Sequence, residues 1–301
     1  MNVPACAIPV LSMFRPAFST PTSHRFLVLV LAAVLTTGRR TVTNLLRTVR
    51  YQANGHGSSS HRVFSQRRWS AWALARALLT FVLDHMVPPG PVLLAGDATV
   101  TEHPGPQVFG KGRYRAGVRS THRYTAYRWG HKWVVVSRLV KWLFATRPWA
   151  LPVLVALDRP PERDRVHGRR HQTPAPMARL RLARLMRWFP KRHFIFADDS
   201  GYGTSETARC CRQHRRHLTL VSQSYGDAAL YAPPPPRTRG TMGRPRVKGQ
   251  QLASPKRSRR KLPSAPALRW PGMGEPREIL RSSRVRGTGT VSGKRSLKSV
   301  G

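Results

Sequence analysis

The chain has 301 residues and a formal net charge of +41, because 53 lysines and arginines stand against 12 aspartates and glutamates. This excess argues against a catalyst of neutral metabolites and for a polyanionic partner, of which nucleic acid is the first candidate. Hydrophobic residues make up 40% of the chain and include 8 Trp, 7 Tyr and 10 Phe. That is enough to bury a core, which excludes a wholly disordered basic protein.

The cysteines and the longest apolar run bear on location. Three cysteines, Cys6, Cys210 and Cys211, cannot build a disulfide framework, so we expect a reducing, cytoplasmic setting. The apolar run 26–35 is shorter than the roughly 20 residues that span a bilayer, and no small-residue cleavage site follows it. We therefore interpret it as a buried helix and expect no membrane partner, with a secretory or membrane role as the alternative.

Residues 1–88 are predicted to form a helical domain. Apolar spacing indicates helices near 22–36, 40–49 and 70–87, with a Gly- and Ser-rich loop at 54–60. No acidic residue precedes Asp84, as suits a DNA-binding domain; the alternative is a helical scaffold whose basic face is merely solvated. The candidate DNA contacts here are Arg39, Arg40, Arg67 and Arg68.

A different pattern occupies residues 89–231. The predicted elements are a strand at 91–100 whose apolar run ends at Asp97, a hairpin of 122–129 and 131–140 turning at Gly130, a strand at 151–157, a helix at 175–189, a strand at 192–199, a helix at 204–214 and a strand at 218–223. This order predicts an α/β fold with a mixed sheet of ribonuclease-H-like arrangement. Residues 232–301 are rich in Pro and Arg and predict a largely disordered basic tail.

Acidic residues are rare, so those at predicted strand ends are candidate ligands. Asp97 ends the first strand, and Asp198 and Asp199 end a strand that neighbours it in a ribonuclease-H-like sheet. Carboxylates are preferred ligands of Mg²⁺ and Mn²⁺, and two such ions can activate water and stabilise a leaving 3′ oxygen. The alternative is that Asp97 and Asp199 cap nearby backbone N–H groups.

Three other motifs fit their chemistry poorly. The spacing of 105–111 is that of a phosphate-binding P-loop, but Gly112 stands where Ser or Thr would hold Mg²⁺. Gly201 and Gly203 lack the third glycine of a dinucleotide-binding turn. Cys210, Cys211, His214 and His217 do not have the usual zinc spacing.

Several segments, taken in order, resemble the DDE-superfamily transposases of bacterial insertion sequences. The resemblance runs from about residue 8 to about 255, and implies a long helical N-terminal region before a ribonuclease-H-like core. It is carried by GRRTVTNLLR, HRVFSQRRWSAWALARALL, LLAGDATVTEHPG, GKGRYRAGVRSTH, RRHQTPAPMARLRLARLMRWFP, FADDSGYG and DAALYAPPPPRTRGTMGRPRVKGQQLASP.

The resemblance implies an activity and its residues. Such enzymes cut DNA at transposon ends and join it to target DNA, using two Asp and one Glu to hold two Mg²⁺ or Mn²⁺ ions. Asp97, in an Asp-x-Thr setting, matches the first Asp, and Asp199, in a pattern of Asp, two small residues and Tyr202, matches the second; Asp198 is a neighbouring candidate ligand. The resemblance also places His122, Arg169, Arg170 and His171 toward DNA.

The third carboxylate is where the sequence departs from that family. In the family the Glu lies on a helix well beyond the second Asp, whereas the acids downstream here are Glu206, Asp227, Glu275 and Glu278. None of them falls in such a helix, so we expect a truncated or frame-shifted relative with an incomplete core that binds DNA but does not transpose it alone. The alternative is a non-catalytic basic nucleic-acid-binding protein, and a second copy of the chain is a further candidate partner.

Overall fold

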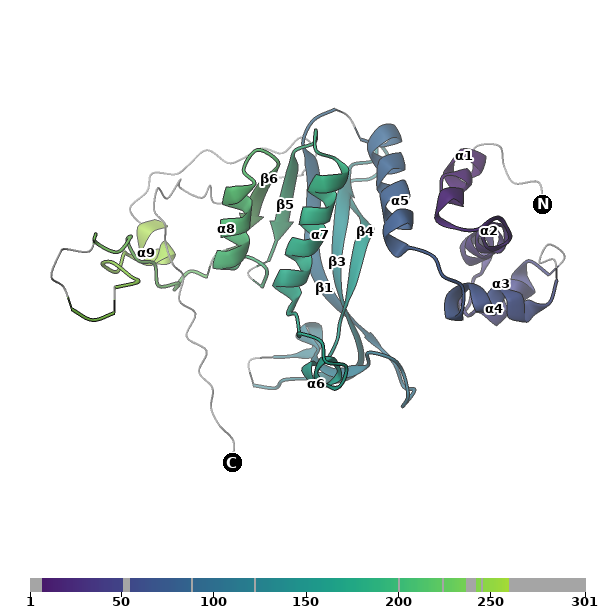
Figure 1. Cartoon of the computed structure of the whole chain (residues 1–301), viewed down its shortest axis with the longest axis horizontal. Coiled ribbons are helices and arrows are strands. Elements are labelled where there is room, and N and C mark those ends of the chain that lie inside the picture. The colour runs from purple at the N-terminus through teal and green to yellow at the C-terminus, as the bar shows by residue number, and fades with distance from the viewer. Residues whose placement is uncertain are drawn as a thin grey trace. The chain divides into compact units, whose positions relative to one another are not determined.

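The structure is a computed structural model that describes residues 7–50, 55–87, 89–121, 123–199, 201–223, 225–236, 242–244 and 246–259. The chain divides into two compact units, Met1–Pro89 and Gly90–Gly301. Figure 1 labels the elements of both.

The first unit is helical, as the sequence predicts. Its elements are α1 (Ala7–Ser12), η1 (Arg15–Ala17), α2 (Thr20–Leu35), α3 (Val42–Thr48), α4 (Gly57–Ser65) and α5 (Ala71–His85). A small core joins α2, α3 and α4 through Leu29, Ala32, Leu45, Val49 and Val63. Among the described residues, no helix combines the length and hydropathy needed to cross a membrane.

Helix α4 corrects one prediction. It begins at Gly57, inside the segment 54–60 that was expected to be a loop. Gly and Ser have low helix propensity, but Val63 is fully buried in the core of this unit. Packing of that face stabilises the helix despite its composition.

The second unit is built on one mixed sheet, which confirms the predicted α/β class. Its strands are β1 (Val92–Glu102), β2 (Gly112–Arg115), β3 (Tyr127–Val140), β4 (Trp149–Asp158), β5 (Phe194–Asp198) and β6 (Leu218–Ser222). They are ordered β2-β3-β1-β5-β6, and β4 also pairs with β3. β1 runs antiparallel to β3 and parallel to β5, and β5 runs parallel to β6.

Two of this unit's helices, α7 and α8, lie on one face of the sheet. The helices of the unit are η2 (Gly117–Arg119), α6 (Pro161–Val166), α7 (Pro174–Trp188), α8 (Ser205–Gln213) and α9 (Pro255–Arg259). α7 packs against β3 and β4, and α8 packs against β6, on the same side of the sheet in Figure 1. Val92, Leu94, Phe194 and Phe196 are fully buried and form the core of the unit.

The predicted hairpin at Gly130 is wrong. β3 is one continuous strand that passes through Gly130, which pairs with Gly112 of β2 and Glu102 of β1. A Cβ at Gly130 would meet the main-chain oxygen of Thr101. The glycine therefore marks a close approach of two strands rather than a turn.

The region predicted as a tail contains a few described elements. Tyr231 and Gln251 form an isolated antiparallel bridge, and α9 follows. Residues 260–301 lie outside the described residues.

Candidate metal centre

Strand register brings Asp97 and Asp199 to one place. β1 and β5 pair in parallel from Val92↔Phe194 to Ala95↔Ala197. Asp97 is two residues beyond the last pair and lies within β1, and Asp199 directly follows the end of β5. The two acids therefore lie at the same end of the paired segment, and the charges of both act on the phenol of Tyr202.

Asp97 does not end its strand, contrary to the sequence-based expectation. β1 continues to Glu102 because its pairing with β3 extends that far. What ends near Asp97 is the parallel pairing with β5. The Asp97 carboxylate therefore projects from a continuous strand, and the edge of that strand away from β5 is paired with β3.

Each of the two carboxylates is oriented by a backbone N–H. Ala98 N donates to Asp97 Oδ1 at 2.7 Å, and Gly201 N donates to Asp199 Oδ1 at 2.9 Å. Among the hydrogen bonds between described residues, none engages Oδ2 of either side chain. Both side chains are exposed, so the two Oδ2 atoms are available to bind a cation.

Asp198 lies on the other face of β5. Side chains two residues apart on a strand share a face, so Asp198 lies on the side of the buried Phe196. Burial raises the pKa of the Asp198 carboxyl to about 6; the Ser222 hydroxyl opposes this shift, and the nearby charge of Asp199 adds to it. The side chain of Asp198 therefore points to the sheet face opposite that of Asp97.

Tyr202 is buried beside the carboxylates and is only 4% exposed. Burial raises the pKa of its phenol, and the negative charges of Asp97 and Asp199, followed by those of Asp158 and Asp198, raise it further. Its hydroxyl has no hydrogen-bond partner among the described residues. In the sequence Tyr202 is visible only as the last residue of the Asp199 motif; its position among the acids depends on the fold.

The turn after β5 places Tyr202. The main-chain oxygen of Asp199 accepts from the N–H groups of Tyr202 and Gly203 at 3.3 and 3.4 Å. A Cβ at Gly203 would collide with the Ser222 hydroxyl. The turn needs glycine because the chain passes tightly over the end of β6.

The donor set fits a divalent cation in part. Two carboxylates supply the hard oxygen ligands that Mg²⁺ and Mn²⁺ prefer. Within the described part of the chain, no group of three or more His, Cys, Asp or Glu is placed to hold a metal. Glu206 of α8 is 69% exposed at its side chain and binds Arg179 at 2.8 Å. Glu275 and Glu278 lie outside the described residues.

A second set of charged side chains surrounds α6, and of its members only His171 is a candidate from the sequence. Lys132 Nζ lies 3.1 Å from Asp158 Oδ2, and both Asp158 and Asp164 are buried. Asp164 binds Arg159 at 2.8 Å and His171 Nδ1 at 3.2 Å. These pairs tie the end of β4 to the loop before α7.

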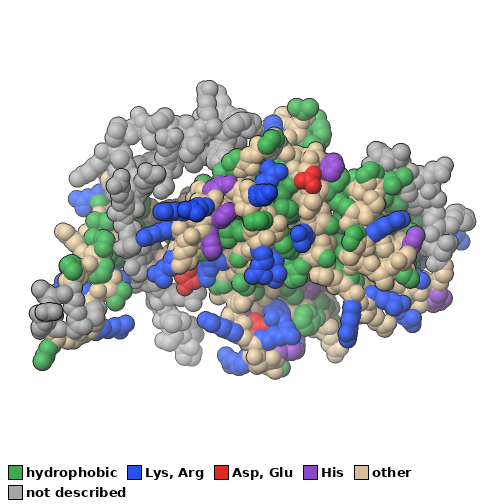
Figure 2. Space-filling model, turned by 45° about the horizontal axis from the view of Figure 1, so that its top comes forward, with side chains coloured by type: hydrophobic (Ala, Val, Ile, Leu, Met, Phe, Trp, Pro, Cys, Tyr) green, Lys and Arg blue, Asp and Glu red, His purple; other side chains and the backbone are tan. Residues whose placement is uncertain are grey.

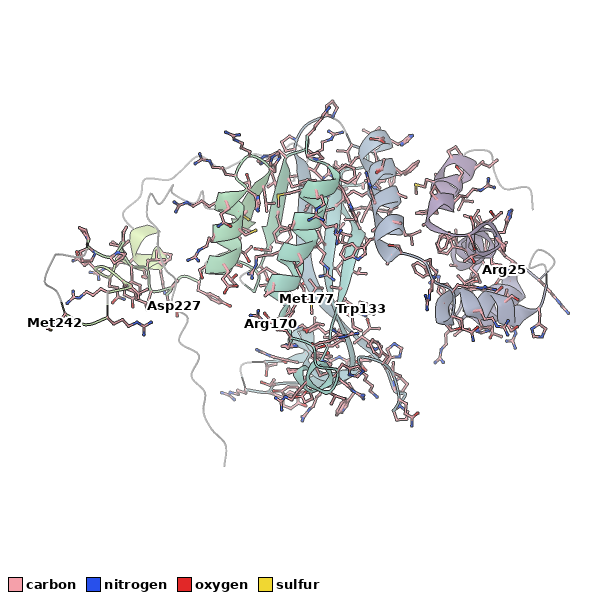
Figure 3. All side chains as sticks on the ribbon, viewed as in Figure 1. Arg25, Trp133, Arg170, Met177, Asp227 and Met242 are labelled. Carbon is pink, nitrogen blue, oxygen red and sulfur yellow. The ribbon has the colours of Figure 1, made fainter. Side chains whose placement is uncertain are left out.

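The predicted DNA contacts are spread over the chain. In the loop between α6 and α7, Arg169 and Arg170 are exposed, whereas His171 is bound to Asp164; Figure 3 labels Arg170 and Met177 of α7. His122 lies outside the described residues. In the helical unit Arg39, Arg40, Arg67 and Arg68 are all exposed. Basic side chains are scattered over the face seen in Figure 2, with few acidic ones among them.

Comparison with known protein families gives a match over most of the chain. The sequence profile of a family described as DDE superfamily endonuclease matches residues 13–284. The match continues past residue 255, where the resemblance of individual motifs fades, and takes in Glu275 and Glu278. No curated protein matches the chain. The matched range covers most of the sequence, and the chain therefore belongs to the DDE superfamily endonuclease family.

Proposed function

We propose that this protein binds DNA and holds a divalent cation, Mg²⁺ or Mn²⁺, between Asp97 and Asp199. The observation that supports this most is the parallel pairing of β1 and β5, because an exposed aspartate follows the last pair on each strand. Membership of an endonuclease family makes DNA the natural substrate. The net charge of +41 suits a polyanionic ligand.

The protein's part in the chemistry is to supply and orient oxygen ligands. A divalent cation bound there would activate water and stabilise the leaving 3′ oxygen of a phosphodiester. Asp97 is oriented by Ala98 N, and Asp199 by Gly201 N. Because a third carboxylate is missing from this place among the described residues, we propose that the 301-residue chain binds DNA without cleaving it.

Further partners and the location belong to the same proposal. We propose that DNA phosphates are contacted by exposed arginines, namely Arg39, Arg40, Arg67, Arg68, Arg169 and Arg170. A second copy of the chain would be a further partner. A reducing, cytoplasmic location agrees with Cys210 and Cys211, which are both free.

A nicking assay tests this function. Supercoiled plasmid is incubated with the full chain and either Mg²⁺ or Mn²⁺, and both binding and nicking are followed by gel electrophoresis. We expect retarded plasmid and no nicked circles. Metal-dependent nicking that the Asp97→Ala variant abolishes would contradict the proposed inactivity and would identify an active endonuclease.

A second function, nucleic-acid binding without any metal, is favoured by one observation. Both carboxylates accept a backbone N–H from a residue one or two positions further along the chain, which is how a capping Asp behaves. This alternative predicts that DNA binding persists and that Mn²⁺ has no measurable affinity for the protein.

A further inference from the structure

The first part of β3 and the short β2 form a two-stranded ribbon with an aromatic and basic face. Arg113 pairs with Trp129 and Arg115 pairs with Tyr127, so all four side chains share one face of the ribbon. Trp129 is 60% exposed and Tyr127 is 50% exposed. The guanidinium of Arg113 lies over the Tyr127 ring at 4.5 Å.

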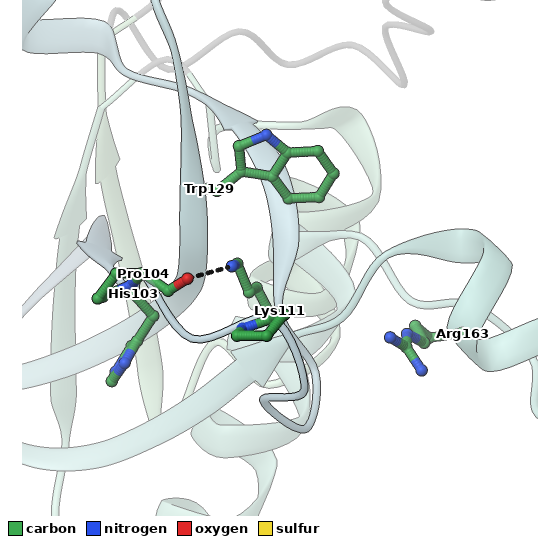
Figure 4. Close-up of a pocket in the computed structure, with 6 residues that line it drawn as sticks. His103, Pro104, Lys111, Trp129 and Arg163 are labelled. Carbon is green, nitrogen blue, oxygen red and sulfur yellow. Dashed lines mark hydrogen bonds between the residues drawn. The ribbon is translucent and has the colours of Figure 1, made fainter.

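A hollow of about 450 Å³ opens at the base of this ribbon. Its lining residues are His103, Pro104, Pro106, Lys111, Trp129 and Arg163. In Figure 4 the Lys111 side chain lies near the indole of Trp129, and Arg163 of α6 lies farther to one side. The volume of the hollow lies within the range of small-ligand sites, so the hollow can admit a flat aromatic group.

The two cations of the hollow are not neutralised by ion pairs, and Lys111 is held in place. Lys111 Nζ donates to the main-chain oxygens of Gly105 at 2.7 Å and Pro104 at 3.4 Å, and lies 5.8 Å from the centre of the Trp129 ring. Neither Lys111 nor Arg163 belongs to any of the ion pairs between described residues. The nearby Glu102 instead binds Arg128 at 3.3 Å. Two positive charges are thus available to an anion.

The wall opposite Trp129 is firmly supported. The His103 ring meets the His131 ring edge-on at 4.8 Å between centroids. His131 is buried, and its Nε2 lies 2.8 Å from the main-chain oxygen of Phe109. These contacts position the His103 ring at the edge of the hollow.

We propose that this hollow binds one nucleotide of single-stranded DNA, with its base stacked on Trp129 and its phosphate between Lys111 and Arg163. An exposed indole beside cations is the combination that single-strand binding uses, since every base has a π-face and every link has a phosphate. In duplex DNA both faces of a base are covered by its neighbours, so the hollow accepts an unpaired base.

The hollow lies on the same sheet face as the candidate metal centre. Alternation along β1 puts Asp97, Thr99 and Thr101 on one face and continues to His103, whose N–H donates to the main-chain oxygen of Trp129. His103 is six residues beyond Asp97, or about 20 Å along an extended strand. One unpaired strand can therefore reach both places, although binding in the hollow requires neither metal nor cleavage.

The test compares binding of two single strands by fluorescence anisotropy in EDTA. The probes are a labelled oligothymidylate of about 12 nucleotides and an abasic strand of equal length. We expect Trp129→Ala to weaken thymidylate binding about tenfold and to leave abasic binding unchanged. The matched control is Trp149→Ala, which removes an indole of similar exposure, 52%, outside the hollow, and leaves both affinities unchanged.

Lys111→Gln provides a second, independent readout. Loss of one phosphate contact lowers the slope of log affinity against log salt by about 0.7 for a single strand, whereas Trp129→Ala leaves the slope unchanged. Equal thymidylate affinities for Trp129→Ala and Trp149→Ala, or an equal loss on the abasic strand, would overturn the inference. Because the titrations are done in EDTA, they report on the hollow without any bound metal, so failure of the hollow and failure of the proposed metal site are distinguished.

Discussion

Asp97 and Asp199 are more than a hundred residues apart in sequence and become neighbours because two parallel strands pair in one register. The sequence could mark them as candidate ligands, because each carboxylate follows an apolar run and acids are otherwise scarce. The burial of Tyr202 and the placement of Lys111 below Trp129 were not accessible in this way. Both depend on which strands and turns meet, and no local pattern encodes that.

Asp198 gives a prediction about pH. Its carboxyl has a pKa of about 6 in the folded protein, against about 3.9 in an unfolded chain. The folded state therefore holds this proton more tightly than the unfolded chain does. The contribution of the protonated carboxyl to the free energy of unfolding is fully present below about pH 4 and is lost as the pH rises toward 6. Asp198→Asn lacks this titration, so its stability relative to the natural chain should improve by about 1–2 kcal/mol between pH 4 and pH 7, allowing for partial solvent exposure.

Urea unfolding of both proteins in EDTA measures this difference. The pH dependence of all other groups cancels when the two curves are subtracted. A stability difference that is the same at pH 4 and pH 7 would show that the Asp198 carboxyl titrates normally.

At the scale of elements, β3 organises the second unit, since it pairs with β1, β2 and β4. The sequence indicated its apolar half correctly but divided it at Gly130, because an isolated glycine between two strand-like runs is typical of a turn. The antiparallel neighbour that presses on Gly130 lies about thirty residues earlier in the chain. Only the folded sheet reveals that this glycine is required by a close contact.

Gly130→Ala tests that interpretation of β3. The new Cβ would collide with the main-chain oxygen of Thr101, and strands must move apart to admit it. We expect a loss of about 1–3 kcal/mol in the free energy of unfolding, measured by urea denaturation. The control is Gly117→Ala, where a Cβ would meet nothing within 4 Å. Equal stabilities of the two variants would refute a close-contact role for Gly130.

At the scale of the whole molecule, the sequence predicts both a type of partner and a fold class. The charge of +41 predicted a polyanionic partner, and the order of elements predicted a mixed α/β sheet after a helical region. The family match over residues 13–284 places this sheet in an endonuclease superfamily. The part that sequence reasoning could not supply is the third ligand, because the later acids follow no apolar periodic segment that would fix their position.

The central claim is that Asp97 and Asp199 together bind a divalent cation. Calorimetric titration of Mn²⁺ into the full chain, into Asp97→Asn/Asp199→Asn and into Glu206→Gln tests it most directly. Glu206 is a matched carboxylate on α8 that binds Arg179 of α7. We expect Mn²⁺ binding by the natural chain and by Glu206→Gln, and none by the double variant. Absence of binding to the natural chain, or undiminished binding to the double variant, would contradict it.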